Sequence, residues 1–109
     1  MITVHLRYKG TNGSAKAFVD EMISSGTVDL IRAEVGNLRY EYYQSLDDPE
    51  TVLLIDQWRD KAAIDAHHTS PMMQMIAALR EKYDLHMAVE RFVSNEGGMP
   101  EADRSFIRK

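Results

Sequence analysis

Four stretches of the chain alternate apolar and polar residues with the period of two that is typical of β-strands. They cover residues 2–8, 38–45, 52–58 and 85–93. Residues that favour turns, chiefly Gly, Asn, Asp and Pro, separate them. The third stretch departs from alternation, because Val52-Leu53-Leu54-Ile55 is apolar on both faces. This run predicts a strand that is covered on both sides.

Between the strands, apolar residues recur every three or four positions, as in an amphipathic helix. The first helical region starts at Ser14, the expected N-cap, and ends at Gly36-Asn37, where glycine supplies a left-handed helix end. In the second region, Asp60 is expected to cap a short helix, and Ser70-Pro71 starts another. The apolar stripe of that last helix consists of Met72, Ile76, Leu79 and Tyr83.

The resulting order β, α, β, β, α, β predicts an α+β fold of the ferredoxin-like, split βαβ type. Its four-stranded antiparallel sheet would carry helices on one face, and the doubly apolar third strand points to a second copy on the other. We therefore expect one domain over residues 1–93 and a homodimer in which two sheets pack together. Residues 94–109 lose periodicity but keep Phe106 and Ile107, so we expect an arm that docks on the body or on the partner subunit.

Composition excludes several classes of function. The net charge of −4 has no basic block, which argues against a nucleic-acid partner, and no apolar run is long enough to span a bilayer. The chain has no cysteine, and the N-terminal residues enter the strand pattern without a basic and then apolar signal segment. A cytoplasmic protein is expected. No Gly-rich phosphate loop, Gly-x-Ser-x-Gly or His-Glu-x-x-His motif is found, so no nucleotide, flavin or metal site is predicted.

Two motifs resemble the antibiotic biosynthesis monooxygenase family of dimeric α+β barrels. One is Asp56-Gln57-Trp58 followed by Ala62, Ile64, His67 and Ser70-Pro71-Met72; the other is Ile31-Arg32-Ala33-Glu34 followed by Gly36-Asn37-Leu38-Arg39-Tyr40-Glu41. The resemblance covers residues 1 to 93. It implies a homodimer with a small-molecule cavity between sheet and helices in each subunit. Some members of the family oxygenate phenols or quinols with dioxygen and without metal or flavin; related proteins degrade haem or isomerise small phosphorylated sugars.

His67 is the expected catalytic residue. It follows Ala63 and Ile64 by one helical turn, so it faces the same side as small apolar residues. A neutral histidine there could accept the proton of a phenol or hydroquinone. The alternative is a structural histidine at a helix C-terminus, stabilised by the helix dipole. His68 is rotated away by about 100° and is expected at the surface, so the pair does not form a metal site.

The other candidate residues would shape a substrate site, and each also has a purely structural interpretation. Trp58 could stack on a planar substrate or seal the core. Tyr40 or Tyr42 could hold a phenolate oxygen or pack across strands. Met72 and Ile76 are expected to form the apolar wall or the core.

The leading hypothesis is thus a cofactor-independent monooxygenase that oxidises a quinol or polycyclic phenol with dioxygen. The first alternative is an enzyme that isomerises or degrades a small phosphorylated signalling sugar, for which Arg7 or Arg39 would have to point into the cavity. The second is a dimeric protein that binds a small ligand without catalysis. Haem degradation is disfavoured, because the first strand lacks the asparagine that haem-degrading relatives use.

Overall fold

A computed structural model of the chain describes residues 1–94 and 97–108. The elements follow one another in the order β1 (Ile2–Lys9), α1 (Ser14–Ser24), α2 (Thr27–Arg32), β2 (Asn37–Gln44), β3 (Thr51–Trp58), α3 (Lys61–His68), α4 (Met72–Lys82), β4 (His86–Val93) and α5 (Glu101–Arg104). The four strands pair in the order β2-β3-β1-β4, and all three pairings are antiparallel. The predicted α+β, ferredoxin-like fold is confirmed.

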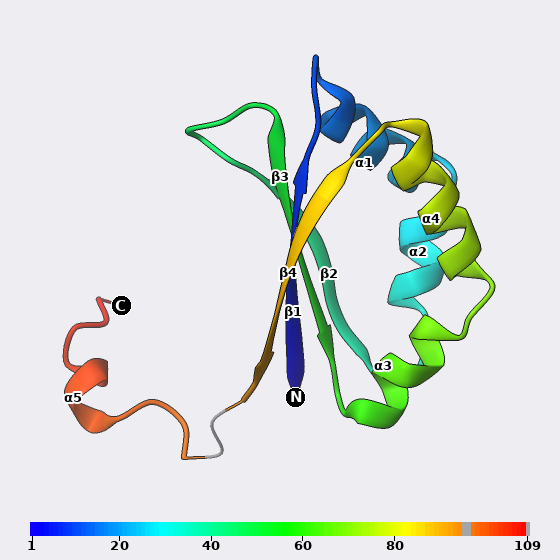
Figure 1. Cartoon of the computed structure of the whole chain (residues 1–109). Helices are drawn as coiled ribbons and strands as arrows, with labels where there is room; N and C mark the ends of the chain where they lie inside the picture. The colour runs from blue at the N-terminus through cyan, green and yellow to red at the C-terminus, as the bar shows by residue number, and fades with distance from the viewer. Residues whose placement is uncertain (95–96, 109) are drawn as a thin grey trace.

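The helices α1 to α4 lie on one side of the sheet and leave its other side open (Figure 1). We call these sides the helix-facing side and the open face. Alternate residues of each strand occupy the helix-facing side, where Tyr8, Phe18, Met22, Leu54 and Trp58 are among the most completely buried side chains. The core therefore lies between one sheet face and one layer of helices, as the single apolar face of β1 requires.

Local sequence signals set several of the helix ends. Asp60 caps α3, because its side chain accepts a hydrogen bond of 2.9 Å from the backbone N–H of Ala63. The predicted cap at Ser14 is wrong: α1 begins at Ser14, and Gly13 precedes it with a left-handed backbone, φ 81°. The hydroxyl of Ser14 instead accepts from the N–H of Thr11 and tightens the turn.

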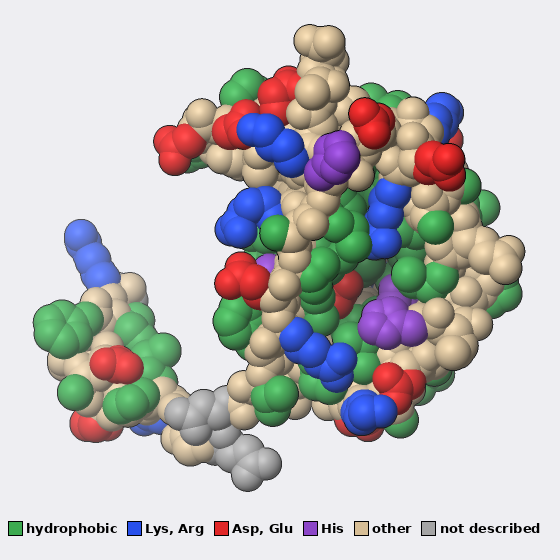
Figure 2. Space-filling model, in the orientation of Figure 1, with side chains coloured by type: hydrophobic (Ala, Val, Ile, Leu, Met, Phe, Trp, Pro, Cys, Tyr) green, Lys and Arg blue, Asp and Glu red, His purple; other side chains and the backbone are tan. Residues whose placement is uncertain are grey.

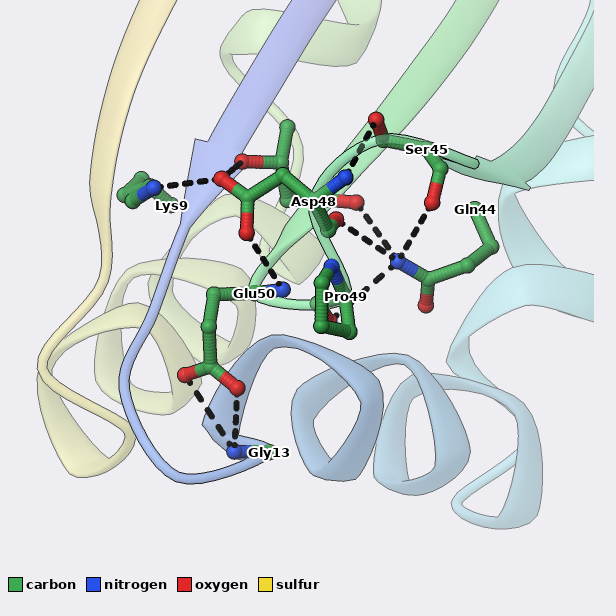
Figure 3. A network of polar contacts seen from close by, with 8 residues as sticks. Lys9, Gly13, Gln44, Ser45, Asp48, Pro49 and Glu50 are labelled. Carbon is green, nitrogen blue, oxygen red and sulfur yellow. Dashed lines mark hydrogen bonds and ion pairs between the residues drawn. The ribbon is translucent and has the colours of Figure 1, made fainter.

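The turn between β2 and β3 is held by a polar network (Figure 3). The carboxylate of Asp48 accepts from the ammonium of Lys9, the backbone N–H of Glu50 and the hydroxyl of Thr51. The amide of Gln44 donates to several carbonyls of the same turn. This network fixes the hairpin that sets the register of β3, and with it the positions of the site residues that β3 carries.

β4 forms one edge of the sheet, and all of its residues are exposed. Met87 and Val89 pair with helix-facing positions of β1, yet they are 45% and 52% exposed, because no helix crosses in front of them. The space between the sheet and the helices is consequently open along this edge. None of the helices in residues 1–94 and 97–108 is long and apolar enough to cross a membrane.

The C-terminal arm lies apart from the body, on the other side of the sheet from α1–α4 (Figure 1). Its short helix α5 buries no residue, and Phe106 is 88% exposed. Docking of this arm on a partner subunit stays a prediction, as does the domain boundary at residue 93. Residues 95, 96 and 109, which belong to the predicted arm, lie outside the described part of the chain.

Candidate functional site

A cavity of about 210 Å³ lies between the helix-facing side of the sheet and helices α3 and α4. Figure 2 shows the hollow at this place, where apolar side chains and side chains of both charges gather with histidine. All four strands and both helices contribute to the lining, which consists of Val4, Leu6, Tyr40, Leu54, Asp56, Ile64, His67, His68, Met73, Ile76, Arg80, Met87, Val89 and Arg91. The cavity thus combines an apolar floor with a few polar groups, as is typical of small-molecule sites.

His67 faces this cavity from α3. It is only 5% exposed, because it shares the buried side of the helix with Ala63 and Ile64. Its ring stacks on that of Trp58, with centroids 4.6 Å apart and an interplanar angle of 28°. The predicted position of His67 on the apolar side of its helix is confirmed; its catalytic role stays a prediction.

Glu34 holds the other side of the His67 ring. Its Oε2 lies 2.7 Å from Nδ1 of His67. A carboxylate only accepts, so Nδ1 carries the hydrogen and Nε2 is left as the proton acceptor. Burial lowers the pKa of His67 below its usual value, and the Glu34 carboxylate opposes that shift. The imidazole is therefore neutral near pH 7.

Helical periodicity continued past Ile31 would place Glu34 on the outer side of a helix, yet its side chain reaches His67. α2 ends at Arg32, so the helical phase no longer applies two residues later. Gly36 then turns the chain with φ 83° and packs so tightly on α3 that a Cβ there would lie 2.4 Å from the Cβ of Ala63. This close approach brings Glu34 to His67. The Gly36-Asn37 pair was the available signal, since it marks the helix end that turns Glu34 inward.

Asp56 is a second polar group that sequence analysis did not single out as a site residue. It lies on the helix-facing side of β3, between Val4 of β1 and Tyr40 of β2, and is 6% exposed. Its Oδ1 accepts a hydrogen bond of 2.8 Å from the indole N–H of Trp58. Burial raises the pKa of Asp56 to about 6, although Trp58 and Arg80 oppose the shift. Both Asp56 and His67 therefore contact Trp58, from different sides.

Two arginines complete the polar part of the cavity. Arg80 of α4 donates from Nε and Nη2 to the hydroxyl of Tyr8, at 3.1 and 2.8 Å, and lies over the Tyr8 ring. Arg91 of β4 pairs with Val4 and so occupies a helix-facing position. Within residues 1–94 and 97–108, neither arginine has a carboxylate at ion-pair distance. His68 is exposed, as predicted, and also lines the cavity at its edge.

The structure brings together some of the predicted substrate residues and separates others. Tyr40 and Ile76 line the cavity with His67. Trp58 is fully buried behind His67, so it supports the ring and leaves the cavity wall to its neighbours. Tyr42 packs edge-to-face on Phe18, and Met72 lines a separate hollow beside Glu34. Burial raises the pKa of both Tyr40 and Tyr42, so both hydroxyls keep their protons near pH 7.

The arginines suggested as anion anchors do not reach the cavity. Arg7 and Arg39 lie on the open face, where they pair with Glu90 at 3.7 Å and with Glu41 at 3.5 Å. Strand alternation is the reason, because both positions are out of phase with the buried residues of their strands. In the described residues, no group of three or more His, Cys, Asp or Glu side chains is arranged to hold a metal ion.

Comparison with known proteins identifies the family. The family described as antibiotic biosynthesis monooxygenase matches residues 1–79. The chain belongs to this family. A curated relative, "Putative monooxygenase YcnE" of Bacillus subtilis strain 168, is 26% identical over 78 residues, which are 72% of this chain and 80% of the relative. The resemblance seen in the motifs around Glu34 and His67 is thereby confirmed.

Solved structures share the fold of this chain. The protein PA3566 of Pseudomonas aeruginosa has a TM-score of 0.73 and 25% identity, with 86% of this chain and 93% of that one covered. SnoaB of Streptomyces nogalater, a cofactor-independent oxygenase, has a TM-score of 0.71 and 17% identity, with 87% and 93% covered. The likeness to SnoaB shows a shared fold.

Proposed function

We propose that this protein is a cofactor-independent monooxygenase that oxidises a small hydroquinone or phenol with dioxygen. The observation that carries the proposal is His67, a buried imidazole whose Nδ1 is bound by Glu34, so that Nε2 is the proton acceptor at an apolar cavity. The family assignment and the fold shared with the cofactor-independent oxygenase SnoaB support it. Catalysis by a positioned base of this kind contributes about 10²- to 10⁴-fold in rate.

In this mechanism His67 takes the hydroxyl proton of the substrate and leaves an electron-rich anion. A ring carbon of the anion bonds to one atom of dioxygen, and the imidazolium returns its proton to the distal oxygen, which gives a hydroperoxide. His67 then removes the hydrogen from the same ring carbon as the O–O bond breaks. One oxygen stays as a carbonyl, and the departing hydroxide takes the proton and becomes water. Substrate and dioxygen thus give a hydroxyquinone and one water.

The size of the cavity favours substrates with one or two rings. Its volume of about 210 Å³ is below the roughly 300–1,000 Å³ of sites for drug-sized ligands. A larger polycyclic phenol would have to extend past the open edge at β4. A small quinol therefore fits the cavity better than a polycyclic phenol. The arginines named for the isomerase alternative, Arg7 and Arg39, lie on the open face, so that alternative would have to use Arg80 and Arg91 instead.

The test is incorporation of isotopic oxygen. Protein freed of metal and flavin is incubated under ¹⁸O₂ with 1,4-dihydroxynaphthalene, and the product is analysed by mass spectrometry. We expect one labelled oxygen atom in the hydroxyquinone and one in water. A quinone product without label, or ligand-induced thermal stabilisation without turnover, would contradict the monooxygenase; the second result would favour a ligand-binding protein.

We propose in addition that the protein is a homodimer that packs through the open face. Leu53 and Ile55 are only half-buried there, and Tyr43, which pairs with Leu53, is 37% exposed. Phe92 is 45% exposed and packs on His5, the partner of Ile55 on β1. Exposed apolar side chains gathered on one face often mark an interface. Light scattering coupled to gel filtration should give twice the mass of the chain, and Ile55→Glu should give the monomer mass. A monomeric wild-type protein would disprove the dimer.

A further inference from the structure

Arg91 is an unusual residue for its position. The helix-facing residues of β4 on either side of it, Val89 and Val93, are apolar, and its partner on β1 is Val4. Arg91 lines the cavity at its open edge. Within the described part of the chain it has neither an ion pair nor a hydrogen bond to its side chain. The carboxylate of Asp65 is close enough for the two charges to interact, but not at ion-pair distance. The donors of this exposed guanidinium at the rim of the cavity are therefore available to a ligand.

Two arginines bring positive charge to the cavity. The protein as a whole has a net charge of −4, and the cations on the open face are paired with carboxylates. Around the cavity, Arg80 and Arg91 carry full positive charges, and His67 is neutral for the reasons given above. Among the described lining residues Asp56 is the one carboxyl group, and its Oδ1 is bound to Trp58. Glu34 is engaged by His67, and Asp65 interacts with Arg91 from beyond ion-pair distance. Two arginines that line a cavity favour an anionic ligand.

The arrangement also gives the ligand a direction. Asp56, Val4 and Arg91 occupy paired positions on three adjacent strands, so the backbones of Asp56 and Arg91 are about 9–10 Å apart. Between them lies an apolar floor that includes Val4 and Val89. A flat ring can rest on this floor with an anionic group at Arg91, on the side away from Asp56.

We propose that the cavity selects a hydroxyaromatic acid of one or two rings, whose carboxylate binds Arg91 while its hydroxyl group faces His67. This inference names a substrate class for the proposed monooxygenase and rests on that function for its site. The planar guanidinium fork matches a carboxylate, which it can bind through two parallel hydrogen bonds. Arg80 adds charge but fewer donors, since two of its N–H groups already bind Tyr8.

Binding without oxygen tests this inference separately from turnover. Isothermal titration calorimetry under nitrogen compares 2-naphthol with 6-hydroxy-2-naphthoate, which differ by the carboxylate alone. We expect the carboxylate to bind about 10- to 100-fold more tightly, as a charged hydrogen-bonded pair provides. Arg91→Met should abolish this preference, and Arg91→Lys should keep part of it. The control Arg39→Met removes an arginine of the open face and should keep all of it.

Two outcomes would overturn the inference. One is equal affinity for both ligands in the wild-type protein, or a preference that survives Arg91→Met in folded protein, as judged by its circular dichroism spectrum. The other is tighter binding of 6-hydroxynaphthalen-2-yl phosphate than of the carboxylate. A carboxylate preference in a protein that takes up no oxygen would support this inference and contradict the monooxygenase. Oxygen incorporation without a preference for the carboxylate would support the monooxygenase and contradict this inference.

Discussion

The two faces of the sheet are made from alternate residues of the same four strands, yet they differ in whether their charged side chains form ion pairs. On the open face, Arg7 and Arg39 are each paired with a glutamate. On the helix-facing side, Arg91 has no described partner, and Asp56 is buried without an ion pair. Paired surface charges contribute little to stability and need no further explanation. A buried carboxylate without an ion pair, such as that of Asp56, costs free energy, which points to a use in binding or catalysis. Arg91 is exposed at the cavity edge and has no such cost.

Asp48 and Asp56 show the same contrast in the pKa values of their carboxyl groups, although they lie in neighbouring segments. Asp48 lies in the polar network of the β2–β3 turn, where the hydrogen bond from Lys9 leads the causes that lower its pKa to about 2 (Figure 3). Asp56 lies on β3 beside the cavity, where burial raises its pKa to about 6. The turn stabilises a charged carboxylate, and the cavity disfavours one.

The largest expected effect is on the free energy of unfolding, where substitution of Leu54 should cost far more than substitution of its neighbour Leu53. Leu54 is 1% exposed on the helix-facing side, so Leu54→Ala should lower the free energy of unfolding by about 2–5 kcal/mol. Leu53 is half-buried on the open face of a single chain, so Leu53→Ala should cost about 1 kcal/mol in the monomer and more where the proposed partner subunit covers it. Urea denaturation measures both. Equal costs would mean that the open face is as well covered as the core, as a tight dimer would make it.

The next effect is a pH dependence that Asp56 imposes on stability. Its folded pKa of about 6 exceeds the ordinary value of 3.8, so the folded protein binds the proton more tightly. Stability contributed by the protonated form is therefore present below about pH 4 and is lost as the pH rises to about 6. The loss should reach about 3 kcal/mol. Urea denaturation of the wild type across this pH range should show the loss, and Asp56→Asn should lack it. The free energies of unfolding of the two proteins should therefore differ by that amount more at one end of the range than at the other.

Asp48 provides the matched control with the opposite sign. Its folded pKa is lowered, so its contribution is present above about pH 4 and is lost as the pH falls toward about 2. Asp48→Asn should therefore still show the loss of stability between pH 4 and 6 that Asp56 causes. If Asp56→Asn also retains that change, the carboxyl group of Asp56 is not its source.

Glu34→Gln should lower the rate constant kcat by about 10- to 100-fold, because a charged hydrogen bond to His67 is replaced by a neutral one. The carboxylate of Glu34 raises the pKa of His67, so its removal should move the acidic limb of the pH–rate profile to lower pH. Steady-state kinetics of oxygen uptake across pH measures both. A lower rate with an unmoved profile would indicate a structural role for Glu34.

The smallest effect is expected at the ion pairs of the open face. Arg7 and Glu90 are more than half exposed, with side-chain exposures of 54% and 57%. Arg7→Met should therefore change the free energy of unfolding by no more than about 1 kcal/mol. Its effect should decrease further in high salt. A loss of several kcal/mol in urea denaturation would show that the open face depends on its charges and would break the contrast between the two faces.

The fold could be predicted from the sequence because it rests on local patterns. Alternation in β1, the Asp60 cap and the Gly36-Asn37 turn each favour one local structure, and their order leaves few topologies. The position of His67 could also be predicted, since helical phase places it with Ala63 and Ile64. In each case, neighbours in the sequence decide the outcome.

The rest of the site depends on contacts between distant segments. Glu34 reaches His67 across 33 positions of the chain, and only the packing of Gly36 on α3 brings the two together. Asp56 and Arg91 face one cavity because β1 lies between their strands, a pairing that no local pattern records. For Trp58 the sequence left two roles open, stacking on a substrate or sealing the core, and its stacking on His67 of α3 places it fully buried behind that ring.

The most direct test of the account is hydroquinone-dependent oxygen uptake by His67→Ala and His86→Ala, measured beside the wild type. His67 faces the cavity and is buried, whereas His86 is exposed at the start of β4, where its side chain is 83% exposed. With folding and oligomeric state intact, uptake should fall about 10²- to 10⁴-fold in His67→Ala and stay within about twofold in His86→Ala. Unchanged uptake in His67→Ala would contradict the account.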